Sequence, residues 1–307
     1  MHAYQSPSSD IAYSAEAPIL ITASTDAALA RARLGIAASG RRPGAEFKID
    51  EAMNRLDMQA RVGMLWVEIE NDPGGAIDAL LGRVSRDVAD GRYCAVVSTD
   101  RGCLDPVHAM IGDADLEVLV DPSEAERVAA IAIASSQFGA GVSVSDITSD
   151  NGAARLRQLS EEVNRIAATL ARLSSAPAPV GTVEEPASNA QVPPVNVDRV
   201  RAVIRARRLR ARFFSEDLFA DPAWDMLLDL LQAEISQLRV PVSSLCIAAA
   251  VPATTALRWL KAMVARGLFV RRADPHDGRR VFVELAPDTS RAMHRYFAEV
   301  DSATAAI

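Results

Sequence analysis

Residues 243–285 constrain the fold of this chain most, because three kinds of local structure follow one another there. The apolar run Leu245–Ala250 predicts a short helix, which Val251-Pro252 ends because proline disfavours helix at the residue before it. A second helix is predicted from Ala253-Thr254 to Gly267, where glycine can adopt the left-handed dihedrals that close a helix. Two β-prone segments come next. This order of parts predicts a winged helix-turn-helix.

The two β-prone segments are residues 268–272 and 281–285, and a turn-rich stretch over 274–278 separates them. They predict a two-stranded ribbon whose tip is crowded with arginine. Arginine suits a hairpin that touches phosphates or enters a narrow minor groove. The alternative interpretation is a solvated hairpin that binds no ligand.

The longer helix is predicted to have a buried stripe and a polar face. The stripe consists of Leu257, Leu260, Met263 and Val264. Ser243 and Ser244 are expected to cap the first helix, since a serine oxygen accepts from the free amides of a first turn. A helix lying in a groove reaches base edges near its N-terminus and phosphates further along. The candidate DNA-binding residues are Ser243, Ser244, Thr254, Thr255, Arg258, Lys261, Arg271, Arg272, Arg279 and Arg280.

The last third of the chain resembles the MarR-type winged helix-turn-helix transcriptional regulators, from Trp224 to Phe297. The matching features are Val251-x-x-Thr254-x-x-x-Arg258, Gly267-Leu268 and, most specifically, Asp274-x-x-Asp277-x-Arg279. The resemblance implies that Asp274 and Asp277 brace the wing and that Arg279 contacts DNA. It also implies a homodimer formed by flanking helices, which here start near Asp198 and Thr289. The long upstream region departs from the family pattern, so the family's usual mode of small-molecule sensing is not carried over.

Charge is divided unevenly along the chain. Residues 1–195 carry 16 Lys and Arg against 27 Asp and Glu, a net charge of −11. Residues 196–307 carry 17 against 13, a net charge of +4. The basic excess therefore lies where the DNA-binding unit is predicted, as binding to a polyanion requires.

The region upstream alternates β-like and helix-like segments, which predicts an α/β doubly wound domain with a mostly parallel sheet. The expected strands are residues 18–23, 47–49, 62–69, 93–98 and 116–120, and the expected helices are 25–39, 51–60, 76–89 and one from Pro122, placed at N1 after Asp121.

By strand count and segment length this region resembles the receiver domain of bacterial response regulators. Glu68 stands where the receiver's phosphorylated aspartate would end the third strand, and Ser98 or Thr99 supplies the hydroxyl of the fourth. The acidic residues after the first strand and the lysine after the fifth are missing. The resemblance therefore implies a pseudo-receiver that does not accept phosphate. Glu68 is interpreted either as a mimic of the phosphorylated state or as a solvated carboxylate.

A heptad seam follows the α/β region, with apolar residues spaced alternately three and four apart. Its members are Leu156, Leu159, Val163, Ile166, Leu170 and Leu173. It predicts a coiled coil that joins two subunits, the alternative being an amphipathic helix packed on its own domain. An arginine-rich helix is expected over 199–212, docked on the winged domain through Val200, Val203, Ile204 and Leu209. Its other arginines are either solvated or in contact with phosphates.

The expected organisation is a disordered N-terminus at 1–16, a pseudo-receiver domain at 17–145, a dimerisation helix at 150–174, a flexible Pro/Ser/Ala-rich linker at 175–196 and a winged-helix domain at 197–307. The scattered Cys94, Cys103 and Cys246 indicate core residues in a reducing compartment rather than a disulfide or zinc framework. With neither signal-peptide pattern nor membrane-length apolar run, a cytoplasmic protein is expected.

No catalytic, cofactor or metal site is predicted. The four histidines are dispersed, and Cys103, Asp105 and His108 are interpreted as an incidental cluster in a loop. The phosphate-binding and hydrolase motifs that carry a mechanism are missing.

Two functional hypotheses remain. The first is a dimeric regulator that binds double-stranded DNA in a sequence-specific manner. The second is a pseudo-receiver adaptor that binds a protein partner and whose DNA contact is weak or only supports a larger assembly.

Overall fold

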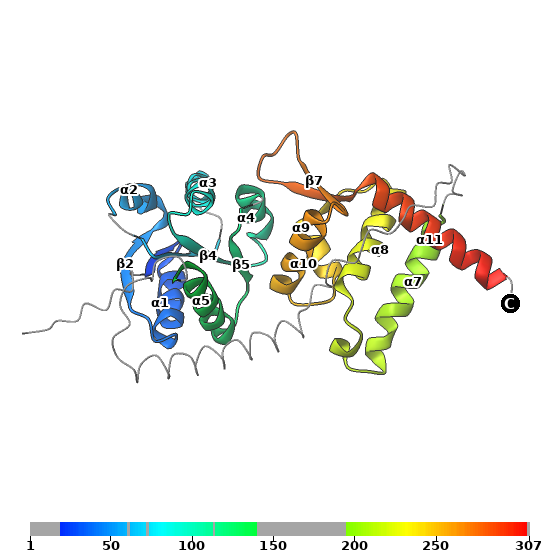
Figure 1. Ribbon diagram of the computed structural model, residues 1–307, viewed down its shortest axis with the longest axis horizontal. Coiled ribbons are helices and arrows are strands. Elements are labelled where there is room, and N and C mark those ends of the chain that lie inside the picture. Colours follow the sequence, from blue (N-terminus) through cyan, green and yellow to red (C-terminus); the bar gives the residue numbers. More distant parts are fainter. Residues whose placement is uncertain (1–18, 60–61, 72–73, 113, 140–194, 306–307) are drawn as a thin grey trace, which may run out of the picture.

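The computed structural model describes residues 19–59, 62–71, 74–112, 114–139 and 195–305. The described chain forms an α/β unit and a mainly helical unit, which Figure 1 shows side by side in blue to green and in yellow-green to red. The predicted coiled coil and the linker up to residue 194 lie outside the described residues, as does the N-terminal segment 1–16.

The α/β unit is built on a five-stranded parallel sheet of order β2-β1-β3-β4-β5. Its strands are β1 (Ile19–Ala23), β2 (Pro43–Lys48), β3 (Met64–Ile69), β4 (Cys94–Thr99) and β5 (Glu117–Val120). β1 and β3 are buried along their whole length, as expected of central strands covered on both faces. The order is that of a doubly wound fold, so the predicted fold class of this region is confirmed.

Helices cover both faces of the sheet. On one side, α1 (Asp26–Ala38) and α5 (Glu124–Gly139) bury a cluster that includes Trp66 and Val96. The other side is covered by η1 (Ile49–Glu51), α2 (Ala52–Asp57), α3 (Gly75–Ala89) and α4 (Leu104–Ile111). Leu65 and Val67 point to this second side, so the two-residue period of β3 separates the two cores.

Two local predictions in this unit were wrong. Residues 104–111 form α4 rather than a loop; Pro106 is tolerated there because it lies in the first helical turn. α5 begins at Glu124 rather than at Pro122. Ser123 and Glu126 cap it reciprocally, each side chain accepting from the other residue's amide.

Glu68 is neither solvated nor placed at an open strand end. It is 3% exposed, and its carboxylate accepts from the Trp66 indole at 2.8 Å and from Arg127 at 2.6 Å. The Arg127 guanidinium also lies 3.3 Å from the Ser98 hydroxyl, across the same face of the sheet. Glu68 is therefore half of a buried ion pair between β3 and α5, which corrects the solvated interpretation.

The second unit contains a helix-turn-helix and a small sheet. Its helices are α7 (Val197–Leu209), η2 (Arg210–Arg212), η3 (Glu216–Phe219), α8 (Pro222–Ile235), α9 (Val242–Ala248), α10 (Ala253–Ala265) and α11 (Pro287–Ala305). The wing strands β7 (Phe269–Ala273) and β8 (Val281–Leu285) are antiparallel. A short strand, β6 (Val240–Pro241), pairs with β8 and makes the ribbon three-stranded, which the sequence pattern did not predict.

α9 and α10 meet at a bend of 107°, within the range typical of a helix-turn-helix. Ala250, with φ of 53°, turns the chain between them. α10 ends as predicted: Gly267 has φ of 70° and donates to the Val264 carbonyl, while Leu268 donates to the Met263 carbonyl. These two bonds define a Schellman motif.

Two further outcomes concern the helices of this unit. Pro241, not a serine, precedes the first turn of α9 and has no side chain that could cap it, so the predicted capping by Ser243 and Ser244 was wrong. The Ser243 amide of that turn donates instead to Asp105 of α4. The arginine-rich helix docks on α8 as expected, because Val200 is buried, Val203 and Ile204 pack against the same core, and Arg207 forms an ion pair with Asp225 at 2.6 Å. The predicted contact of Leu209 was wrong, because its side chain is 48% exposed at the end of α7.

In the described part of the chain, no single helix is long and apolar enough to cross a bilayer. α9 and α10 taken together pass the same test of length and composition, but they are the bent pair just described.

Candidate nucleic-acid interface

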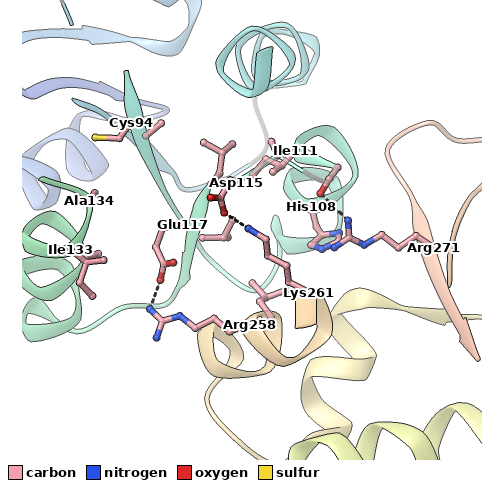
Figure 2. Close-up of a pocket in the computed structure, with 17 residues that line it drawn as sticks. Cys94, His108, Ile111, Asp115, Glu117, Ile133, Ala134, Arg258, Lys261 and Arg271 are labelled. Atoms are coloured by element: carbon pink, nitrogen blue, oxygen red, sulfur yellow. Dashed lines mark hydrogen bonds and ion pairs between the residues drawn. The ribbon is translucent and has the colours of Figure 1, made fainter. Parts of the chain in front are cut away.

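The face of α10 opposite its buried stripe lies against the α/β unit. Leu257, Leu260 and Met263 point into the core of the helical unit, as predicted. The predicted polar face turns toward β5 and the segment before it (Figure 2). The position of this face was therefore predicted, but the domain that covers it was not.

Thr254 lies deepest in this contact. It is 7% exposed, and its hydroxyl oxygen accepts a hydrogen bond of 3.1 Å from the amide of Val120 in β5. Val120 and Leu104 belong to the same apolar cluster as Leu257, so one core continues from one unit into the other. In this arrangement Thr254 has no access to DNA, contrary to its predicted exposure.

The two cations of α10 pair with acids of the α/β unit. The Arg258 guanidinium contacts the Glu117 carboxylate, and the Lys261 ammonium contacts Asp115, as Figure 2 shows. Asp115 is 96% exposed at its side chain, and both basic side chains are about half exposed. Such pairs contribute little individually because water and salt screen them.

Ser243, at the start of α9, is bound to α4. Its amide donates to one oxygen of the Asp105 carboxylate at 2.9 Å, and its hydroxyl donates to the other at 2.5 Å. The sequence pattern placed Asp105 in an incidental cluster. Asp105 lies in the first turn of α4 and faces α9. This role was missed because no helix was predicted there.

The wing also contacts the α/β unit. Arg271 donates to the Gly112 carbonyl at 2.9 Å, directly after the C-terminus of α4. Arg279 forms an ion pair of 3.2 Å with Asp78 in α3. The Gly112 carbonyl lies at the negative end of the α4 helix dipole, and Asp78 is a carboxylate. Both groups therefore attract an arginine.

The remaining candidate residues are Arg272 and Arg280, which pair within the wing, and Ser244 and Thr255. Arg272 pairs with Glu284 at 3.4 Å and Arg280 pairs with Asp277 at 3.3 Å. Ser244 is exposed on α9, and Thr255 is half-buried on α10. The wing turn is held by aspartates, since Asp277 accepts from the amide of Arg279 and Asp274 from that of His276.

A cavity of about 160 Å³ lies between the two units, lined by β4, α4, β5, α5, α10 and β7. Next to it, a second cavity of about 350 Å³ is lined by Gly112, Ala114, Lys261, Val264, Ala265 and Arg271. Among the described residues, no group of three or more His, Cys, Asp or Glu side chains is placed to hold a metal ion.

Neither a protein-family model nor a curated protein sequence matches this chain. Solved structures with a similar part include two of the adhesin competence repressor AdcR from Streptococcus pyogenes. They are 15% and 16% identical, cover 37% and 35% of this chain and 79% and 75% of theirs, and have TM-scores of 0.23 and 0.22. The transcriptional regulator Tm0710 from Thermotoga maritima is 19% identical, covers 35% of this chain and 78% of its own, and has a TM-score of 0.21. At these TM-scores the similarity supports no conclusion about the function of this chain.

Proposed function

We propose that this chain is a DNA-binding transcriptional regulator whose reading unit is the winged helix-turn-helix of α9, α10 and the β7–β8 wing. The observation that carries the proposal is the geometry of α9 and α10: a 107° bend, with the apolar stripe of α10 buried and Arg258 and Lys261 on its other face. A helix presented in this way fits the major groove, and an arginine-rich wing fits the adjacent backbone or minor groove.

Within this proposal the residues have distinct roles. Arg258 and Lys261 contact DNA from α10, and Arg271, Arg272, Arg279 and Arg280 contact it from the wing, with Asp274 and Asp277 holding the wing turn. Ser243, Ser244, Thr254 and Thr255 approach the duplex from the first turns of the two helices. Phosphate contacts by the cations make the affinity depend steeply on salt.

We further propose that the protein acts as a cytoplasmic homodimer through α7 and α11, with the α/β unit as a phosphorylation-independent, receiver-like partner domain. Exposed apolar side chains at the end of α7 and beside it support a contact between copies; they are Leu209, Phe213, Phe214, Leu218 and Phe219. The heptad leucines would add to this dimer. Light scattering on the full chain tests the proposal, and a monomer at tens of micromolar contradicts it.

The experiment for DNA binding is a mobility-shift titration of the full chain with genomic fragments at several salt concentrations. Arg258→Ala combined with Arg279→Ala should weaken binding by at least about tenfold, since each lost phosphate or base contact costs about 1–3 kcal/mol. The matched control is Arg55→Ala with Arg86→Ala, which removes the same charge from exposed positions on α2 and α3. Equal binding by the first variant and the wild type refutes the proposal.

A second candidate function is an adaptor whose winged helix serves protein contact. The observation in its favour is that the polar face of α10 contacts this chain's own acidic residues. The same titration decides between the two, because the DNA contact of such an adaptor is weak and does not depend on Arg258 and Arg279.

A further inference from the structure

The surface proposed to read DNA is covered by the α/β unit. Six of its side chains contact that unit: Ser243, Thr254, Arg258, Lys261, Arg271 and Arg279. The contacts come from α9, α10 and the wing together, so each of the three parts of the reading unit is engaged.

The groups that cover this surface are acceptors, as phosphates and many base edges are. The carboxylates of Asp78, Asp105, Asp115 and Glu117 face the reading unit, and the Gly112 carbonyl joins them at the C-terminus of α4. Arginine and serine donors that suit DNA phosphates are satisfied by these acceptors. The acidic edge of the α/β unit thus presents to α10 the kind of groups that a duplex would present.

Steric exclusion adds to this chemistry. The first turn of a groove-bound helix approaches the bases most closely. Here Thr254, in the first turn of α10, is hydrogen-bonded to the main chain of β5, and Leu257 belongs to one apolar cluster with Val120 and Leu104 of the α/β unit. A double helix and β5 cannot occupy the same side of α10.

We propose that the α/β unit is an intramolecular inhibitor of DNA binding, whose acidic α4–β5 edge competes with the duplex for α10 and the wing. This inference rests on the proposed function. DNA binds only to molecules in which the two units have separated, and its apparent affinity is reduced by the fraction that is closed. By linkage, DNA binding favours separation of the two units by the same factor by which the closed arrangement lowers the affinity for DNA.

The first test weakens the contact from the α/β side, so that no candidate DNA-binding residue changes. Asp115→Lys with Glu117→Lys turns two attractions into repulsions. We expect it to tighten DNA binding by about tenfold at low salt, the size expected from two exposed pairs. Circular dichroism checks that the variant folds.

The control carries the same charge change at the opposite edge of the sheet. Asp50→Lys with Glu51→Lys lies in η1, beside β2, and both residues are exposed. If the control tightens binding as much as the test variant, or if the test variant binds no tighter than wild type, the inhibitor proposal is overturned while the proposed function stands. If neither wild type nor variant binds any duplex, the proposed function fails and the inference fails with it.

The second test needs no substitution. The Val120 amide donates to Thr254 in the closed arrangement, so its hydrogen exchange reports separation of the units directly. Saturating duplex should speed exchange of this amide in the wild-type chain by at least about tenfold, because the closed population falls. Unchanged exchange at Val120 with DNA bound would show that α10 stays on β5, which overturns the proposal.

Discussion

The buried ion pair of Glu68 and Arg127 gives the sharpest test of how the α/β unit is held together. Both side chains are almost fully enclosed, with Arg127 at 10% and Glu68 at 4% side-chain exposure. Glu68→Leu leaves a buried guanidinium without its counter-charge, and Arg127→Met leaves a buried carboxylate whose remaining cation is Arg31, at 3.8 Å. Each single change should cost about 3–5 kcal/mol of unfolding free energy.

The double variant should cost much less than the sum of the two. It removes both charges together, and the main loss left is the acceptor of the Trp66 indole, about 1–3 kcal/mol. The measurement is urea unfolding followed by Trp66 fluorescence, in a background with Trp224→Phe and Trp259→Phe so that only this unit is reported. The two single losses are expected to exceed the double loss by several kcal/mol.

The exposed pair of Arg55 and Glu51 provides the comparison, because replacing either residue should cost less than about 1 kcal/mol. Additive losses for Glu68 and Arg127, or single losses as small as those of the exposed pair, would refute the reasoning.

Three further predictions concern local features. Gly267→Ala should lower the unfolding free energy of the helical unit by about 1 kcal/mol, since φ of 70° strains an alanine although its Cβ would meet open space; an unchanged thermal midpoint contradicts this. Burial raises the pKa of the Asp229 carboxyl, against the opposing charge of Arg208, so its ionised form opposes folding above the normal carboxyl pKa. Asp229→Asn should therefore stabilise the protein at pH 7, with the gain fading as pH falls toward about 4; a constant gain at both pH values counts against it. Burial, and secondarily the charge of Asp105, raise the pKa of the Cys246 thiol to about 12, so iodoacetamide at pH 8 should leave Cys246 unlabelled in the native protein; rapid labelling in peptide mass maps would contradict its placement.

Local signals in the sequence were sufficient for much of the fold. The left-handed glycine at 267 and the proline at 252 defined α10 to within a residue, because turn chemistry acts over a few positions. The apolar runs at 18–23 and 62–69 predicted the strands β1 and β3, because a short apolar run is also a local signal. α4 was missed because it is short and contains Pro106, which masked its apolar stripe.

The environment of the candidate site could not be predicted from the same signals. The polar face of α10 was placed correctly, yet Thr254 meets Val120 across 134 positions of sequence. No sequence pattern near either residue predicts this hydrogen bond. The burial of Glu68 likewise depends on Arg127, which is 59 residues away.

Withdrawal of α10 leaves β5 as an unprotected outermost strand. In the described sheet no sixth strand accepts a hydrogen bond from the Val120 amide. The released molecule therefore has an exposed strand edge, which can template pairing between chains. We expect the released form to self-associate or to bind an extended segment of another protein. A fall in solubility would then report that the two units have separated.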